Sequence, residues 1–385
     1  MIGIPDRSPG TVPSRAGTPA RLSLAHLRGR SAAPGPRRVR GRDVRRRSGR
    51  RAAPGRAVRG TAVGRGGQHP RGHLPGRPGR GGVPGEAVGP GLPAPFWQVW
   101  EELQRIGVPA ASVTAVHSEL EPCRLPGCYC DPLLRRFGFP GAEISFGQPY
   151  GTTPGERAAA VAAVADRAAA LAKLVGQPVP PRARPVPPPA GEPAAPPVDG
   201  ARLGQVLAAT FGHDQVQRYH PDELARAGVL QGQELTLVSA GLPARIPYLF
   251  QAWSVVPVPE RLRARGSPLP PEALGRLDSL VTLGGDGHCV IGMLVSGPPH
   301  LLGGLWAVDP DLGTTRFVSS GAAVFARMLA VLTRGRQRMR GLDPYAAGEV
   351  VERLQGQLAS IDPPAFHGED NWWPLLVEQM WNGLL

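Results

Sequence analysis

The chain has 385 residues, with 44 lysines and arginines against 30 aspartates and glutamates, and a formal net charge of +14. The first 95 residues hold 20 arginines, three acidic residues and no aromatic residue, which leaves a net charge of −3 for residues 96–385. A segment without aromatics buries too little apolar surface to offset the cost of ordering its backbone, so a folded basic domain is excluded there. We predict a disordered Arg/Gly/Pro-rich leader over residues 1–95.

The apolar residues of this sequence exclude a membrane protein. No apolar run approaches the roughly 20 residues that a membrane-spanning helix requires. The N-terminus also lacks the apolar stretch of a secretory signal. The arginines of the leader are suited to contact phosphates, but proteins that bind single strands usually add aromatic rings for stacking. We therefore expect a cytoplasmic protein without a membrane partner.

Residues 96–175 predict a small α/β unit. Apolar residues recur at helical spacing after Phe96, and Gly107 and Pro109 end that pattern. Pro154 opens an alanine-rich stretch that favours a long helix. In chain order we predict a helix over residues 96–106, a strand over 111–116, a helix start at 121–123, a short helix over 133–137, a strand over 142–146 and a helix over 153–175.

Residues 176–200 contain ten prolines and predict a semi-rigid linker between two domains. The stretch that follows, residues 201–385, predicts an α+β domain with an antiparallel-rich sheet and flanking helices. The expected helices cover residues 201–211, a stretch leading into 241–243, and 324–333, 346–360 and 372–381. The expected strands cover residues 216–219, 280–283, 290–295, 305–308 and 315–318.

Several polar residues of this second domain predict structural roles. Gly284 to Gly287 is typical of a hairpin turn, and Asp309 to Asp311 of another turn. His288 is expected in a turn or at the surface, and Cys289 as a small core residue. We find no catalytic constellation in this domain and expect no cofactor in it.

Cys123, Cys128 and Cys130 form the most chemically loaded stretch of the sequence. Thiolates a few residues apart beside a helix start can share a tetrahedral zinc ion. Three interpretations remain open: a zinc site whose catalytic half is missing, a purely structural zinc, and unliganded thiols in a loop.

The segment from Glu121-Pro122-Cys123 through the strand at Ala142 to Phe146 resembles the C-terminal half of a nucleic acid/nucleotide deaminase of bacterial polymorphic toxin systems. The resemblance implies that Cys123 and Cys130 are zinc ligands, with Cys128 nearby. In that family a preceding helix with His-x-Glu or Cys-x-Glu supplies the third ligand and the catalytic glutamate. Glu119 matches this text only weakly because it lies four residues before Cys123, so the unit is expected to be incomplete.

The second domain resembles the fourth subgroup of the SUKH superfamily of immunity proteins, α+β domains encoded beside bacterial toxins. The matching residues follow the expected order: Gly241-Leu242-Pro243, Gly284 to Gly287, Leu305 to Asp309, Phe317 to Ser320, Phe325, Asp362 to Phe366, and Trp372-Trp373. The resemblance implies that residues 201–385 bind and neutralise a cognate protein toxin.

Trp372 and Trp373 are candidate partner-binding residues. Adjacent helical residues point about 100° apart, so we expect that the two indoles cannot both be buried in one core. The sequence thus predicts an immunity protein with a cytoplasmic site of action. The alternative is a zinc-dependent cytosine or adenine deaminase fused to an immunity domain, with a nucleic acid or nucleotide as substrate.

Overall fold

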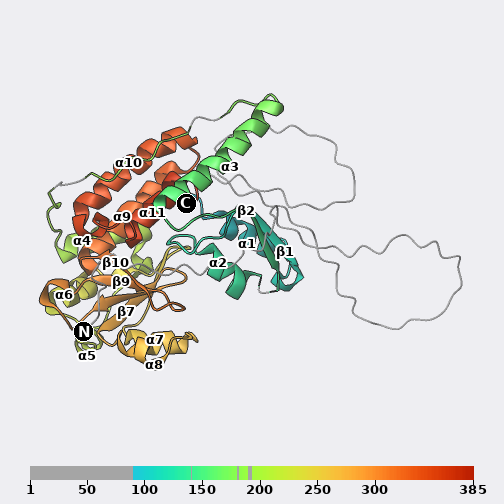
Figure 1. Cartoon of the computed structure of the whole chain (residues 1–385). Helices are drawn as coiled ribbons and strands as arrows, with labels where there is room; N and C mark the ends of the chain where they lie inside the picture. Colours follow the sequence, from blue (N-terminus) through green and yellow to red (C-terminus); the bar gives the residue numbers. More distant parts are fainter. Residues whose placement is uncertain (1–89, 140, 180–181, 190–192) are drawn as a thin grey trace, which may run out of the picture.

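The computed structural model describes residues 90–139, 141–179, 182–189 and 193–385 (Figure 1). The leader expected over residues 1–95 falls almost entirely outside the described residues. The described residues form three sheets: one of two strands in residues 96–175, and one of six strands and a second of two strands in residues 201–385, with no strand pairing between the two parts. We refer to these parts as the middle unit and the C-terminal domain.

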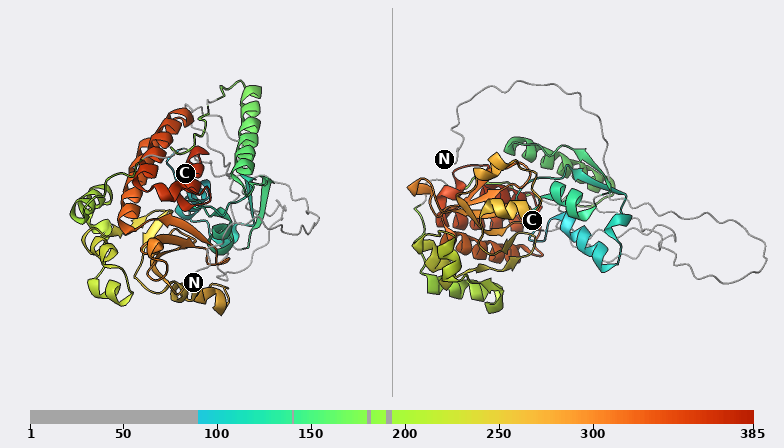
Figure 2. Two further views of the ribbon diagram at one scale, coloured as in Figure 1. Left: turned by 60° about the vertical axis from the view of Figure 1, so that its left-hand side comes forward. Right: turned by 90° about the horizontal axis from the view of Figure 1, so that it is seen from below.

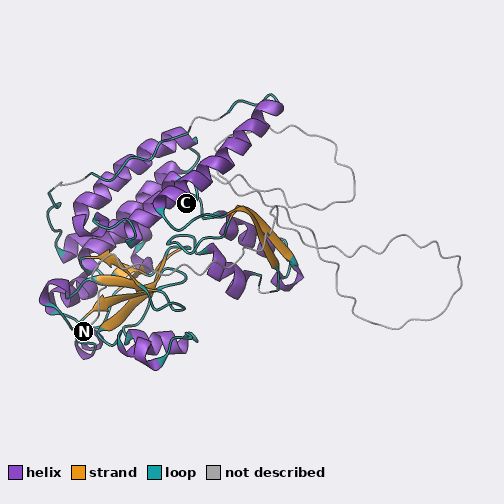
Figure 3. Ribbon diagram, viewed as in Figure 1, coloured by secondary structure: helices purple, strands orange, loops and turns teal. Residues whose placement is uncertain are grey.

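The middle unit pairs two parallel strands, with helices packed beside them (Figure 3). Ala115 lies opposite Glu143 and Leu120 opposite Gln148, with the crossover made through a short helical stretch. Its elements are α1 (Pro95–Arg105), β1 (Ala115–Leu120), α2 (Cys130–Leu133), a π-helical turn (Leu134–Gly138), β2 (Glu143–Gln148) and α3 (Pro154–Leu174).

Helix α3 begins where the sequence predicted, and its N-terminus explains why. Thr153 accepts a hydrogen bond from the Glu156 amide, while the Glu156 carboxylate accepts one from the Thr153 amide. This capping box satisfies amides that a helix start otherwise leaves without a partner. The result is a 21-residue helix that extends past the rest of the middle unit (Figure 2).

The C-terminal domain is built on a six-stranded antiparallel sheet in the order β10-β9-β8-β7-β6-β5. Its strands are β5 (Arg245–Ile246), β6 (Phe250–Ala252), β7 (Leu280–Gly285), β8 (Val290–Leu294), β9 (Leu305–Val308) and β10 (Thr315–Ser319), and β3 (Val216–Gln217) pairs separately with β4 (Leu242–Pro243). Its helices are α4 (Gly200–Phe211), α5 (Pro221–Arg226), α6 (Gln231–Ser239), α7 (Val258–Ala264), α8 (Pro271–Gly275), α9 (Ala322–Met339), α10 (Pro344–Ile361) and α11 (Trp372–Trp381).

Both faces of this sheet are covered, so its central strands are buried throughout. Val281 and Ile291 pack in one apolar cluster with residues of α9, including Phe325. The alternate positions Leu280 and Val290 pack with α7 and α8 on the opposite face. Strand period two therefore distributes the apolar residues of β7 and β8 to two separate helical layers.

The structure corrects several predicted elements. The first strand lies at Ala115–Leu120 rather than 111–116, because residues 110–112 form a short helical turn after Pro109. No helix starts at residues 121–123; the chain turns at residues 126–128, and helix α2 begins only at Cys130. Gly284 and Gly285 belong to strand β7 instead of the hairpin turn, and a Cβ at Gly284 would lie 2.3 Å from the Gln251 carbonyl oxygen.

The middle unit and the C-terminal domain share one hydrophobic core. Leu120, Tyr129 and Val164 of the middle unit belong to the same cluster of buried residues as Phe325 and Trp372. The proline-rich segment also contacts the C-terminal domain, since Gln355 of α10 donates a hydrogen bond to the Val186 carbonyl. No helix in the described part of the chain is both long and apolar enough to cross a membrane.

Candidate functional site

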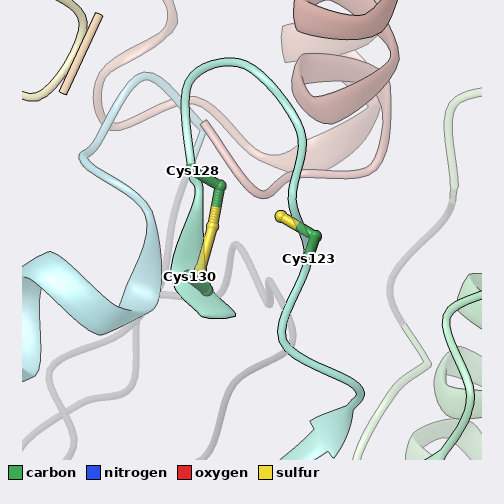
Figure 4. Close-up of side chains that lie close together, drawn as sticks. All are labelled: Cys123, Cys128 and Cys130. Atoms are coloured by element: carbon green, nitrogen blue, oxygen red, sulfur yellow. A yellow bond between two sulfur atoms is a disulfide. The ribbon is translucent and has the colours of Figure 1, made fainter. Parts of the chain in front are cut away.

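The cysteine loop is folded by a tight reversal after strand β1. Gly127 and Tyr129 both adopt left-handed backbone conformations, with φ of +86° and +46°. The Asp131 amide then donates a hydrogen bond of 3.0 Å to the Cys123 carbonyl, which ties the two limbs of the loop together. As a result the side chains of Cys123, Cys128 and Cys130 face one another (Figure 4).

The predicted metal-ligating sulfurs are brought together. The three Sγ atoms lie within 4.8 Å of one another, and Cys128 and Cys130 form a disulfide. Cys123 is a free and buried thiol, and burial raises the pKa of that thiol. Three thiolates at this spacing suit a zinc ion, which requires that the disulfide be reduced, because zinc binds thiolate sulfur.

Glu119, the weak candidate for the catalytic carboxylate of a deaminase site, is engaged elsewhere. Glu119 lies on β1, and its carboxylate is 3.6 Å from the Arg167 guanidinium of α3. The group of converging ligand atoms at the cysteine loop consists of the three sulfurs alone. The described residues thus fit a three-sulfur zinc site, but they do not supply the glutamate that would move protons at a metal-bound water.

Trp372 and Trp373 are both fully buried, so the expectation that they could not share a core is wrong. Their rings meet edge to face at 4.8 Å, and Phe325 lies 6.4 Å from each. Helix α11 belongs to the core that the C-terminal domain shares with the middle unit, and seven of its ten residues are buried. Because α11 is covered on several sides, both indoles are buried although they point in different directions.

Asp286, which the sequence assigned to a simple turn, lies at the centre of a buried polar network. Its carboxylate accepts hydrogen bonds of 2.8 Å from the Tyr129 hydroxyl, the Trp372 indole and the Cys289 amide. Burial raises the pKa of Asp286, while these hydrogen bonds act in the opposite direction. Burial, with the nearby Asp286 charge, also raises the pKa of Tyr129, so the hydroxyl stays protonated and donates.

His288, which the sequence placed in a turn or at the surface, is buried beside this network. Its Nε2 atom is 3.4 Å from an Asp309 carboxylate oxygen, and these two side chains form a close group of possible metal ligands with Cys289. Arg124 of the middle unit reaches the same carboxylate at 3.6 Å. Two members of this group already have partners in the middle unit: Asp309 pairs with the Arg124 guanidinium, and the Cys289 sulfur is hydrogen-bonded to the Tyr129 hydroxyl. We therefore interpret the group as a structural polar contact.

The sequence did not predict a second buried contact, which joins Arg157 and Glu378. Arg157 of α3 is 2% exposed and makes two hydrogen bonds to the Glu378 carboxylate of α11, of 2.6 and 2.7 Å. The third arm of the guanidinium donates to the Thr152 carbonyl at 2.6 Å. Two residues 221 positions apart carry no local pattern, so only a tertiary structure could pair them.

Comparison with known families agrees with both resemblances. Residues 202–379 match the family model of the SUKH-4 immunity proteins, and residues 87–169 match that of a Xanthomonas-like deaminase. No curated protein and no solved structure matches the chain. The C-terminal domain therefore resembles the SUKH-4 immunity proteins, and the middle unit resembles a deaminase of toxin systems.

Proposed function

We propose that this chain is an immunity protein of a bacterial toxin system, which binds and neutralises a cognate toxin through residues 201–385. The observation that carries the proposal is the match of residues 202–379 to the SUKH-4 immunity proteins. The fold supports it, since that segment contains all six strands of the large sheet. A toxin that acts inside the producing cell would require the protein in the cytoplasm.

The proposed division has the middle unit at residues 96–175, a linker at 176–200 and the immunity domain at 201–385. The separate sheets support this division. The shared hydrophobic core shows that the two folded parts pack against each other.

Co-expression of the full chain with the toxin encoded beside it tests the proposed function. We expect cells to survive toxin induction only when the chain is present, and the two proteins to purify together. Induction of an unrelated toxin is the control and should kill with or without the chain. Cell death in the presence of the well-expressed chain, with no complex recovered, would contradict the proposal.

A zinc-dependent deaminase is the second candidate function, favoured by the three converging sulfurs and the deaminase match. Cys123, Cys128 and Cys130 would hold the zinc, whose chemistry in such enzymes is to activate water. This candidate predicts that the reduced, zinc-loaded chain releases ammonia from cytosine or adenine nucleotides or from single-stranded DNA, and no release would contradict it. Release of ammonia would establish the enzyme and a nucleic-acid or nucleotide substrate.

A further inference from the structure

The contact between the middle unit and the C-terminal domain is specific in its chemistry. Two side chains of the middle unit, Tyr129 and Arg157, insert into the C-terminal domain and are each 2% exposed. Each meets a carboxylate there, Asp286 in the first case and Glu378 in the second. Tyrosine and arginine buried against matched groups are typical anchors of protein–protein recognition.

The two sides of this contact carry opposite charges. Among the described residues, every ion pair between the two parts has its arginine in the middle unit and its acid in the C-terminal domain. The arginines are Arg124, Arg136 and Arg157, and the acids are Asp309, Asp311 and Glu378. Such complementarity fixes orientation and selects partners.

The cysteine loop is one of the parts of the middle unit that enter the contact. Gly127 lies so close to the C-terminal domain that a Cβ there would be 2.5 Å from a Leu385 methyl and 2.7 Å from a Leu376 methyl. Tyr129 stands between the two disulfide cysteines in sequence, and Cys123 and Cys128 belong to the shared core. In a deaminase, this is the loop that carries the zinc ligands.

We infer that this intramolecular contact is a toxin–immunity contact made in cis. The face of the C-terminal domain around Asp286, Asp311 and Glu378 is its toxin-binding face, and the partner it fits is a deaminase-fold toxin, held by its metal-ligand loop. In the full chain the middle unit occupies that face. The inference rests on the proposed function and adds to it the partner class, the binding face and the loop that is covered.

Charge reversal at the Arg157–Glu378 pair tests whether the contact is specific, with full-length chains throughout. Arg157→Glu and Glu378→Arg should each lower the unfolding midpoint, and the double variant should recover most of the loss because the pair is restored in reverse. Arg135→Glu is the matched control, since Arg135 pairs with Asp131 inside the middle unit. A double variant no more stable than the single variants would overturn the inference.

Mixing the two single variants provides a second readout that does not depend on stability. The Arg157→Glu chain keeps an intact binding face, and the Glu378→Arg chain keeps an intact middle unit. A 1:1 complex should therefore form on mixing, detectable by sedimentation, while each variant alone stays monomeric. Absence of a complex between two folded variants would also overturn the inference.

Binding of the purified toxin encoded beside the chain separates this inference from the proposed function. Arg157→Glu should bind that toxin at least about tenfold more tightly than wild type, because its own middle unit no longer competes as a tethered ligand. Glu378→Arg should bind it more weakly, and the Arg135→Glu control should match wild type. Equal binding by all four chains overturns the inference and leaves the proposed function standing, whereas no binding by any of them overturns the proposed function.

Discussion

The Tyr129 hydroxyl donates a hydrogen bond of 2.8 Å to Asp286, and this bond joins residues 157 positions apart. Both residues are at most 2% exposed, so water does not compete for the bond. The same Asp286 oxygen accepts from Trp372, which fixes the carboxylate against helix α11. Through this one carboxylate the middle unit, the sheet and the last helix are held together, and we expect them to unfold as a single cooperative unit.

Tyr129→Phe tests this joint directly. Removing the hydroxyl leaves the buried Asp286 carboxylate with one donor fewer, and the free energy of unfolding should fall by about 1–3 kcal/mol. Chemical denaturation measures it. Tyr345→Phe is the control, because Tyr345 is 55% exposed and its change should stay within about 0.5 kcal/mol. Equal, small effects of the two substitutions would show that the Tyr129 bond contributes nothing.

Gly127→Ala should destabilise the protein by about 1–3 kcal/mol, because the residue has a positive φ and its Cβ would contact Leu385 and Leu376. Gly155→Ala is the matched control, since Gly155 lies in helix α3 with open space around its Cβ position. Alanine there should stabilise by up to about 1 kcal/mol. Thermal unfolding of both variants would reveal the opposite signs; a neutral Gly127→Ala would contradict the tight fit of the loop.

Acid should destabilise the contact through Asp309. Burial alone would raise the pKa of Asp309, but the His288 side chain and the backbone amides of Asp311 and Leu312 lower it well below its usual range. The unfolded chain therefore binds this proton first, and the stabilisation present above about pH 4 is lost as the pH falls further. Such a group contributes a slope of at most about 1.4 kcal/mol per pH unit.

Denaturation of wild type and Asp309→Asn between pH 2 and pH 5 measures that contribution. The variant should show a flatter pH dependence, because the titrating carboxylate is gone. Asp278→Asn, at an exposed position, is the control and should keep the wild-type slope. Parallel curves for wild type and Asp309→Asn would contradict the assignment.

Zinc binding should depend on the redox state of the cysteine loop. The oxidised chain has one thiol at the loop, whereas reduction of Cys128–Cys130 provides three sulfurs within 4.8 Å. Elemental analysis should find about one zinc per reduced chain and none per oxidised chain. Cys123→Ser should lose the metal, and Cys289→Ser should retain it. The reverse pattern would place the metal beside His288 and Asp309 instead.

Local patterns predicted much of the fold because local chemistry decides it. Thr153 and Glu156 form the cap that starts α3, and the strands from Leu280 onward follow their apolar runs. The segment of residues 245–275 was missed, since β5 and β6 have only two and three residues and α7 and α8 are short. Elements of that length gain their stability from the sheet and helices around them, which no local window contains.

The sequence by itself determined the separation of a basic, aromatic-free N-terminal quarter from an acidic remainder, the two family resemblances and the gathering of three cysteines in one loop. Only the tertiary structure decided where that loop lies. It enters the C-terminal domain with Tyr129 on Asp286, while helix α3 of the same unit places Arg157 on Glu378. Burial of a polar group requires a partner of matching chemistry, and that partner came from more than 150 positions away, beyond the reach of any sequence periodicity.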